Sequence, residues 1–354
     1  MLLLALWVVA APAKPRSAPA ESRPGLLTSK EEHARAEKVV GPENTAHNCA
    51  ACHMYEDHAW QHTHHFTGFT RRHRTQTAHE ILQNMEQLSM KRQGSCRQCH
   101  YTSTLQDDKL MPQWGVSCES CHGAAKDWVN IHDRIGGDPK GAMLKWGQGK
   151  TETPAEREAR LSAAEARGMI TSRMIYDLAS RCFQCHIVSD EQVVNRGKHP
   201  ADSDFDLVGW SQGEMRHNFV DSRGAPEHPA NRQLTPNERR RMYVVGVAVD
   251  LEYSLRNVLA AREPGGAFQQ VMVERANDAR DELAAILKMV QIPELQSVIA
   301  QLPRRITSPV DIPANLPARL GQATRQFTAR YDGSTLDALD AQISTDVVGT
   351  PYRR

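Results

Sequence analysis

The chain has 354 residues, enough for two domains, and its 43 basic and 42 acidic residues leave a formal net charge of +1. This balance gives no argument for a nucleic-acid partner. Only 6% of the residues are aromatic, whereas there are eight cysteines and 16 histidines. The placement of cysteine and histidine is therefore the most informative feature of the sequence.

The N-terminus carries a short apolar segment that ends in an A-x-A cleavage pattern at residues 11–13. We predict a signal peptide over residues 1–13 and export to the periplasm, although the usual basic residues before the apolar segment are missing. An uncleaved anchor is the alternative. The segment is too short to cross a bilayer, and no later segment is long and apolar enough. Peripheral membrane association stays open. Residues 14–46 are predicted to be a flexible lead-in with one helix around residues 30–39.

Four copies of the pattern C-x-x-C-H follow between residues 49 and 186. Two thiols three positions apart can form thioethers with the two vinyl groups of one porphyrin, and the histidine that follows becomes the proximal iron ligand. The cysteines are Cys49, Cys52, Cys96, Cys99, Cys118, Cys121, Cys182 and Cys185, and the proximal histidines are His53, His100, His122 and His186. The pattern predicts four covalently attached haem c groups.

Zinc sites and disulfides are the alternatives for paired cysteines, because two C-x-x-C turns make a good zinc site. Histidine follows all four pairs, although it accounts for only 16 of 354 residues. The haem interpretation explains that coincidence and uses every cysteine, so no disulfide is expected. Haem maturation of this type also favours export.

Between the motifs, we expect helical stretches at residues 77–85, 126–132 and 152–168. Histidines are dense after the first motif, at positions 58, 62, 64, 65 and 73. That is more than one iron needs, so we expect most of them to be polar surface residues or partners of haem propionates.

The segment from about residue 47 to 222 resembles the tetrahaem cytochrome c-554 family. The matching pieces are a C-x-x-C-H followed by Trp60 and His65, the run Gly-Val-Ser-Cys-Glu-Ser-Cys-His-Gly at residues 115–123, and His132 ten residues after the third motif. The resemblance implies a periplasmic electron-transfer protein with closely stacked haem pairs. It also implies that three haems have two axial histidines, whereas the second haem has an open position.

The resemblance also implies distal ligands. Carried over by position, His132 serves the first haem and His65 the third, so that each haem of this pair takes a ligand from the segment after the other motif. His64 is the alternative to His65. His217 is the best match for the fourth haem, and His199 could exchange places with it. His79 and His199 have no counterpart in the family and are candidates for the position that is open on the second haem.

Residues 235–354 contain neither cysteine nor histidine and lie outside the resemblance. A capping box at residues 235–238, with proline at the first helical position, predicts the start of a long helix with one apolar stripe. A break at residues 264–266 and a second long helix follow. Shorter helices are predicted at residues 293–301, 317–331 and 334–343. We interpret the apolar stripes as core rather than as an interface.

The predicted fold is therefore mostly α. It comprises a tetrahaem cytochrome c domain over residues 47–222, with little regular sheet and haems forming its core, then a linker over residues 223–234 and a separable haem-free helical bundle over residues 235–354. Two functions compete. One is a non-catalytic carrier that relays electrons between redox partner proteins through haems with two histidine ligands. The other is a reductase or oxidase of small nitrogen or sulfur species at an open second haem, with Arg72, Arg74, Arg97 and Tyr101 near it. The sequence favours the carrier and leaves enzyme activity open.

Overall fold

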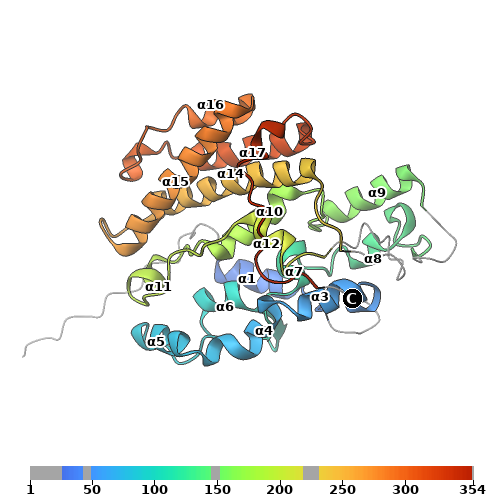
Figure 1. Cartoon of the computed structure of the whole chain (residues 1–354). Coiled ribbons are helices and arrows are strands. Elements are labelled where there is room, and N and C mark those ends of the chain that lie inside the picture. The colour runs from blue at the N-terminus through green and yellow to red at the C-terminus, as the bar shows by residue number, and fades with distance from the viewer. Residues whose placement is uncertain (1–25, 43–48, 145–151, 218–230, 353–354) are drawn as a thin grey trace, which may run out of the picture.

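The computed structural model describes residues 26–42, 49–144, 152–217 and 231–352. The described chain is mostly helical, as the sequence predicts, and it also has one small two-stranded sheet (Figure 1). The predicted signal peptide and most of the predicted linker lie outside the described residues.

Short helices make up the chain as far as the last C-x-x-C-H motif and just beyond it. In chain order they are α1 (Ser29–Ala36), α2 (Cys49–Cys52), α3 (Met54–Gln61), α4 (His64–Arg71), η1 (Arg72–Arg74), α5 (Gln76–Asn84), α6 (Gly94–His100), α7 (Cys118–His122), α8 (Val129–His132), η2 (Ile135–Gly137), α9 (Pro154–Glu165), α10 (Ile175–His186), α11 (Glu191–Asn195) and α12 (Leu207–Gln212). Each motif lies on a helical turn, in α2, α6, α7 or α10. Helical positions three apart share a face, so the two thiols of a motif project to one side.

A hairpin that the sequence analysis did not anticipate separates the second and third motifs. Strand β1 (Thr102–Gln106) pairs antiparallel with β2 (Lys109–Trp114). The two loop residues, Asp107 and Asp108, have φ angles of 49° and 58°. Two left-handed residues in a two-residue loop match the twist of the flanking strands. The Asp-Asp pair between two alternating segments was the available sequence signal.

Long helices dominate the remainder of the chain. The long helices are α14 (Pro236–Ala260), α15 (Ala267–Met289) and α17 (Leu316–Arg330), and they are accompanied by the short helix α16 (Pro293–Ile299) and the turns η3 (Pro309–Asp311) and η4 (Asp337–Leu339). The predicted capping box is present, because Thr235 and Glu238 exchange side-chain to backbone hydrogen bonds. The helix expected at residues 334–343 is instead only the single turn η4.

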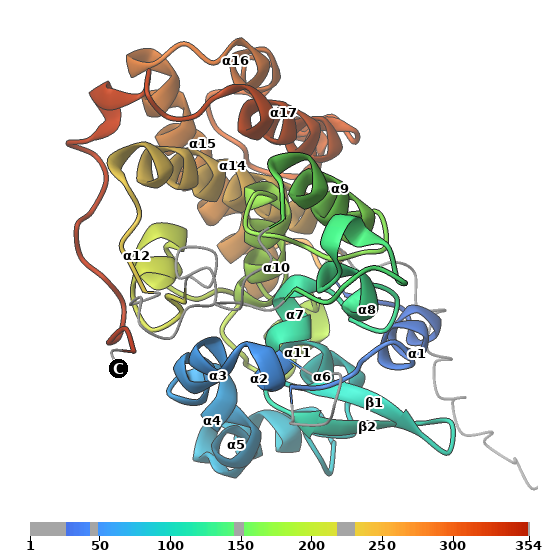
Figure 2. The same cartoon turned by 90° about the vertical axis from the view of Figure 1, so that its right-hand side faces the viewer.

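Helix α14 is buried around most of its circumference, not along one stripe, and its apolar side chains are core as predicted. It packs against α10, α12, α15 and α17. In both views α10 lies between α14 and the motif helix α7 (Figures 1 and 2). Neighbours on several sides remove the solvent-facing side that an amphipathic surface helix would keep.

One hydrophobic core joins the C-terminal helices to the fourth motif. It runs from Ile175 and Phe183 on α10, through α14 and α15, to Ile343. The apolar clusters around the other motifs are small by comparison. The predicted boundary at residues 223–234 therefore does not coincide with a break in the core.

The C-terminal tail is a second connection between the two halves. The backbone of Val348 bonds to both Gly209 and Glu214 at the two ends of α12. Farther on, the backbone carbonyl of Tyr352 accepts hydrogen bonds from the side chains of Tyr55 on α3 and Asn231. Tyr352, the last described residue, thus lies beside α3, which follows the first motif.

Candidate haem sites

Each motif histidine faces one other histidine. The distances between ring centres are 6.2 Å for His53 and His132, 6.3 Å for His100 and His199, 6.2 Å for His122 and His217, and 6.3 Å for His186 and His65. Two imidazoles that bind one metal from opposite sides, each with its nitrogen about 2 Å from the metal, have ring centres roughly 6 Å apart. All four pairs fit one haem iron between the two rings.

The second ring nitrogen of most of these histidines is held in place. Backbone carbonyls lie 2.6–2.8 Å from the Nδ1 atoms of four of them, and a serine hydroxyl lies 3.0 Å from the Nδ1 of a fifth. The pairs are His122 with Ile170, His132 with Val129, His199 with Pro200, His217 with Met215, and His186 with Ser203. A carbonyl only accepts, so Nδ1 carries the proton and Nε2 keeps its lone pair for a metal.

Burial lowers the pKa of the four motif histidines and so favours their uncharged form. It is the main cause that lowers the pKa of His53 and of His100 to about 3, with a smaller contribution from the facing histidine in each case. Burial, followed by the charges of His65 and Arg275, lowers the pKa of His186 to about 4. A neutral imidazole is the form that binds iron.

The structure pairs the histidines differently from the family-based prediction in two sites. His132 lies against His53, as expected. His65, however, lies against His186 rather than His122, and His217 takes the place next to His122. Spacing along the chain does not determine which ring a side chain reaches, because the direction of α4 depends on its packing against the segment before the third motif.

The structure also distinguishes between His79 and His199, the two candidates for the position facing the second motif histidine. His199 faces His100, whereas His79 is exposed on α5 and makes no ring contact with a motif histidine in the described part of the chain. His64 is exposed as well, and its Nδ1 lies 2.7 Å from a carboxylate oxygen of Glu214. His64 therefore does not replace His65.

The cysteines show that the motifs are neighbours in space. The thiols of Cys49 and Cys118 lie close enough to shift each other's pKa, and so do those of Cys99 and Cys185. Cys121 lies near enough to Cys185 for the charge of one to influence the other. The first motif thus adjoins the third, the third adjoins the fourth, and the fourth adjoins the second.

Residues around the third motif lock this arrangement, and their roles were not predicted. The buried carboxylate of Glu119 accepts hydrogen bonds from the backbone N–H groups of Val40, Gly41 and Ala125, at 2.7–2.9 Å. Trp60 donates to the carbonyl of Val116 at 2.8 Å. Together these bonds tie the lead-in, α3 and the third motif into one unit.

The two glycines that flank the third motif are required by close packing. A Cβ at Gly115 would lie 2.0 Å from the carbonyl oxygen of His65. Gly123 has a φ of +86°, and a Cβ there would lie 2.2 Å from the carbonyl oxygen of Gly168. Both positions therefore exclude side chains, which explains why the run at residues 115–123 begins and ends with glycine.

Among the residues predicted to lie near the second haem, Tyr101 adjoins His100, and the charge of Arg72 contributes to the lowered pKa of that histidine. Arg97 is buried and makes a two-pronged ion pair with Glu32 of α1, at 2.7 and 2.8 Å. Arg72 and Arg74 are exposed on η1. The hydroxyl of Tyr101 and the indole N–H of Trp128 are buried without a hydrogen-bond partner among the described residues. Tyr101 adjoins His100, and Trp128 adjoins His132. Each of the two polar hydrogens could be donated to the carboxylate of a haem propionate.

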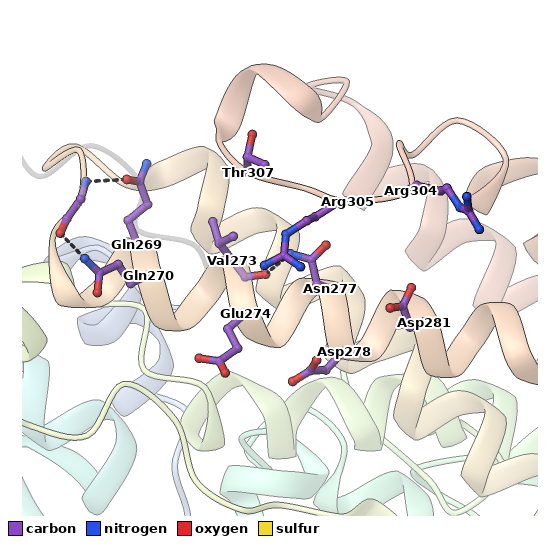
Figure 3. Close-up of a pocket in the computed structure, with 11 residues that line it drawn as sticks. Gln269, Gln270, Val273, Glu274, Asn277, Asp278, Asp281, Arg304, Arg305 and Thr307 are labelled. Carbon is purple, nitrogen blue, oxygen red and sulfur yellow. Dashed lines mark hydrogen bonds between the residues drawn. The ribbon is translucent and has the colours of Figure 1, made fainter.

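A pocket lies along α15 (Figure 3). Side chains of both signs line it, with Glu274, Asp278 and Asp281 on the helix and Arg304 and Arg305 on the segment that passes over it. None of the motif residues contributes to this pocket.

C-x-x-C-H turns with facing histidines are the arrangement expected of a multihaem c-type cytochrome. Residues 48–123 match the family model described as Cytochrome c554 and c-prime. The match covers the first three motifs and confirms the predicted resemblance over that segment, about a fifth of the chain. It implies an electron-transfer protein with covalently bound haem c, a class that is typically extracytoplasmic.

The other comparisons give no relatives. No curated protein and no solved structure matches the chain. The helices in the described ranges include none with the length and apolar character needed to span a bilayer. All eight cysteines are free, and the described residues contain no group of three or more His, Cys, Asp or Glu side chains suited to a bare metal ion.

Proposed function

We propose that the chain is a periplasmic electron carrier that holds four haem c groups, each through two cysteines and two histidines. The observation that carries this proposal is the set of four histidine pairs with ring centres 6.2–6.3 Å apart. The proposed ligand pairs are His53 with His132, His100 with His199, His122 with His217, and His186 with His65.

Bound haem supplies an iron that changes reversibly between ferric and ferrous states. The chain's own contribution would be to fill both axial positions and to hold five of the eight imidazoles by their Nδ1 atoms. A site closed in this way leaves no iron position for a substrate, and its ligands need not rearrange when the charge of the iron changes. These features favour a relay over a reductase or oxidase.

The second motif decides between the two functions, since the competing proposal requires an open iron there. His199 faces His100 at 6.3 Å, with its Nδ1 only 2.7 Å from the carbonyl of Pro200. This geometry supports His199 as a sixth ligand at the position that the resemblance implies to be open.

The order in which the motifs adjoin suggests the path that electrons take through the chain. The motifs adjoin in the order first, third, fourth, second, so the first and second lie at the two ends. We propose that redox partner proteins exchange electrons with the chain at these ends.

Electron paramagnetic resonance of the oxidised protein tests the proposal. We expect four covalent haems by intact mass, four low-spin signals and no high-spin iron. His199→Ala should convert one haem of four to the high-spin form and allow it to bind carbon monoxide. His79→Ala is the matched control and should leave all four low-spin. A high-spin haem that binds carbon monoxide in the unmodified protein would instead support an open catalytic site.

A further inference from the structure

The segment after the fourth motif folds back along it and holds its histidine. Val188 donates to the carbonyl of Ala201 at 2.8 Å, and the backbone N–H of Ser203 donates to the carbonyl of His186 at 3.2 Å. The Ser203 hydroxyl lies 3.0 Å from Nδ1 of His186. The ring of Phe205 stacks on the same imidazole, with centres 4.2 Å apart. The position of this segment therefore determines the surroundings of His186.

One arginine from the C-terminal helices fixes that segment. Arg275 of α15 donates through Nη1 to the carboxylate of Asp202 and to the carbonyl of Ser203, both at 3.1 Å. Its Nε and Nη2 atoms donate to the two carboxylate oxygens of Asp250 on α14, at 2.7 and 2.8 Å. The Arg275 side chain is only 12% exposed and that of Asp250 only 18%. Solvent therefore screens the charges of Arg275 and Asp250 only weakly.

We propose that this cluster, formed by Arg275, Asp250 and Asp202, sets the reduction potential of the haem held by His186 and His65. The inference rests on the proposed function. It assigns a role to the C-terminal helices, which lie outside the family match. Asp250, Asp202 and Arg275 are positioning residues: they place Ser203 against the iron ligand and add fixed charges beside it.

The physical argument has two parts. A hydrogen-bond acceptor at Nδ1 makes an imidazole a stronger donor to its metal, which favours the ferric state. Fixed charges act on the same balance, since a negative charge favours the ferric iron and a positive charge the ferrous iron. The bonds from Arg275 through Ser203 to His186 keep the guanidinium on the order of 10 Å from the ring. At that distance a unit charge, in an effective dielectric of about 20, changes the oxidised-to-reduced ratio on the order of tenfold.

Potentiometric titration of the holoprotein, with each haem followed by its paramagnetic signal, tests the inference. Asp250→Asn removes one negative charge but leaves Arg275 bonded to Asp202 and Ser203. We expect one of the four reduction potentials to rise. At a fixed applied potential, the oxidised-to-reduced ratio of that haem should fall about three- to tenfold, and tenfold equals about 59 mV for one electron. Ser203→Ala should raise the same potential, because it removes the acceptor of His186.

A double variant separates charge from structure. Asp250→Asn with Arg275→Gln removes one charge of each sign, so the potential should return towards that of the unmodified protein. A purely structural role predicts a shift at least as large as that of the single variant. Asp340→Asn is the control, because it also removes the carboxylate of an Asp–Arg ion pair. Its partner Arg240 lies on α14, ten residues or about 15 Å along the helix from Asp250.

The control should leave all four potentials unchanged. If Asp250→Asn also leaves all four unchanged while the four haems remain low-spin, this inference fails and the carrier function stands. High-spin iron in the unmodified protein would instead count against the carrier function itself.

Discussion

Removal of the C-terminal helices is the perturbation with the largest expected effect. The sequence predicts that a chain ending near Arg232 keeps four haems, because every candidate ligand precedes residue 218. The structure leads us to expect the opposite. Helix α10 carries the fourth motif and buries Ile175, Tyr176 and Phe183 in the core that it shares with α14 and α17.

The magnitude follows from the apolar surface that the truncation exposes. Ile175, Tyr176, Phe183 and Ile187 are each at least 91% buried. Burial of one large apolar side chain contributes about 1.5–3 kcal/mol, so four amount to about 6–12 kcal/mol. A typical domain has a free energy of unfolding of only about 5–15 kcal/mol. The truncated chain should therefore fail to hold the fourth motif.

Intact mass and the absorbance per haem of the exported protein measure the outcome. We expect the truncated chain to be degraded or to lack at least the fourth haem. Phe327→Ala in the full chain is the control: it opens a cavity in α17 that costs about 3–5 kcal/mol but should leave four low-spin haems in the folded protein. A truncated chain with four haems and an unchanged spectrum would refute the shared-core argument.

Two further predictions concern the third motif and the ring planes. Glu119→Ala leaves three buried backbone N–H groups without their acceptor, at about 1–3 kcal/mol each. Guanidinium unfolding should therefore show a loss of about 3–9 kcal/mol in the free energy of unfolding, and a loss below 1 kcal/mol would contradict the anchoring role. The ring planes of His53 and His132 differ by 14°, whereas those of His122 and His217 differ by 86°. The oxidised protein should thus give one rhombic and one highly anisotropic low-spin signal, and His217→Ala should abolish only the second; loss of the rhombic signal would overturn the pairing.

Local chemistry was accessible from the sequence alone. The C-x-x-C-H spacing identifies the thiols and the first histidine of each site, because a single helical turn brings them together. The capping box at Thr235 and the glycine-rich break before α15 likewise act within a few residues. Such features depend little on the fold around them, so their interpretation needs no tertiary information.

Features that join distant segments were decided by the tertiary structure. His65 and His217 were both expected to face an iron, but their partners, His186 and His122, depend on how α4 and the chain after α12 pack. The family-based assignment could not supply this, since it carried positions along the chain and not directions in space. His199 differs from His79 for the same reason: only the folded chain brings one of them to His100.

The union of the two halves is likewise a tertiary property. The absence of cysteine and histidine after residue 235 correctly marks a change in chemistry, but a change in chemistry is not a break in packing. Phe183 and Leu251 belong to one core although they are far apart in the chain. Burial depends on which apolar faces pack against each other, and the composition along the chain does not predict this packing.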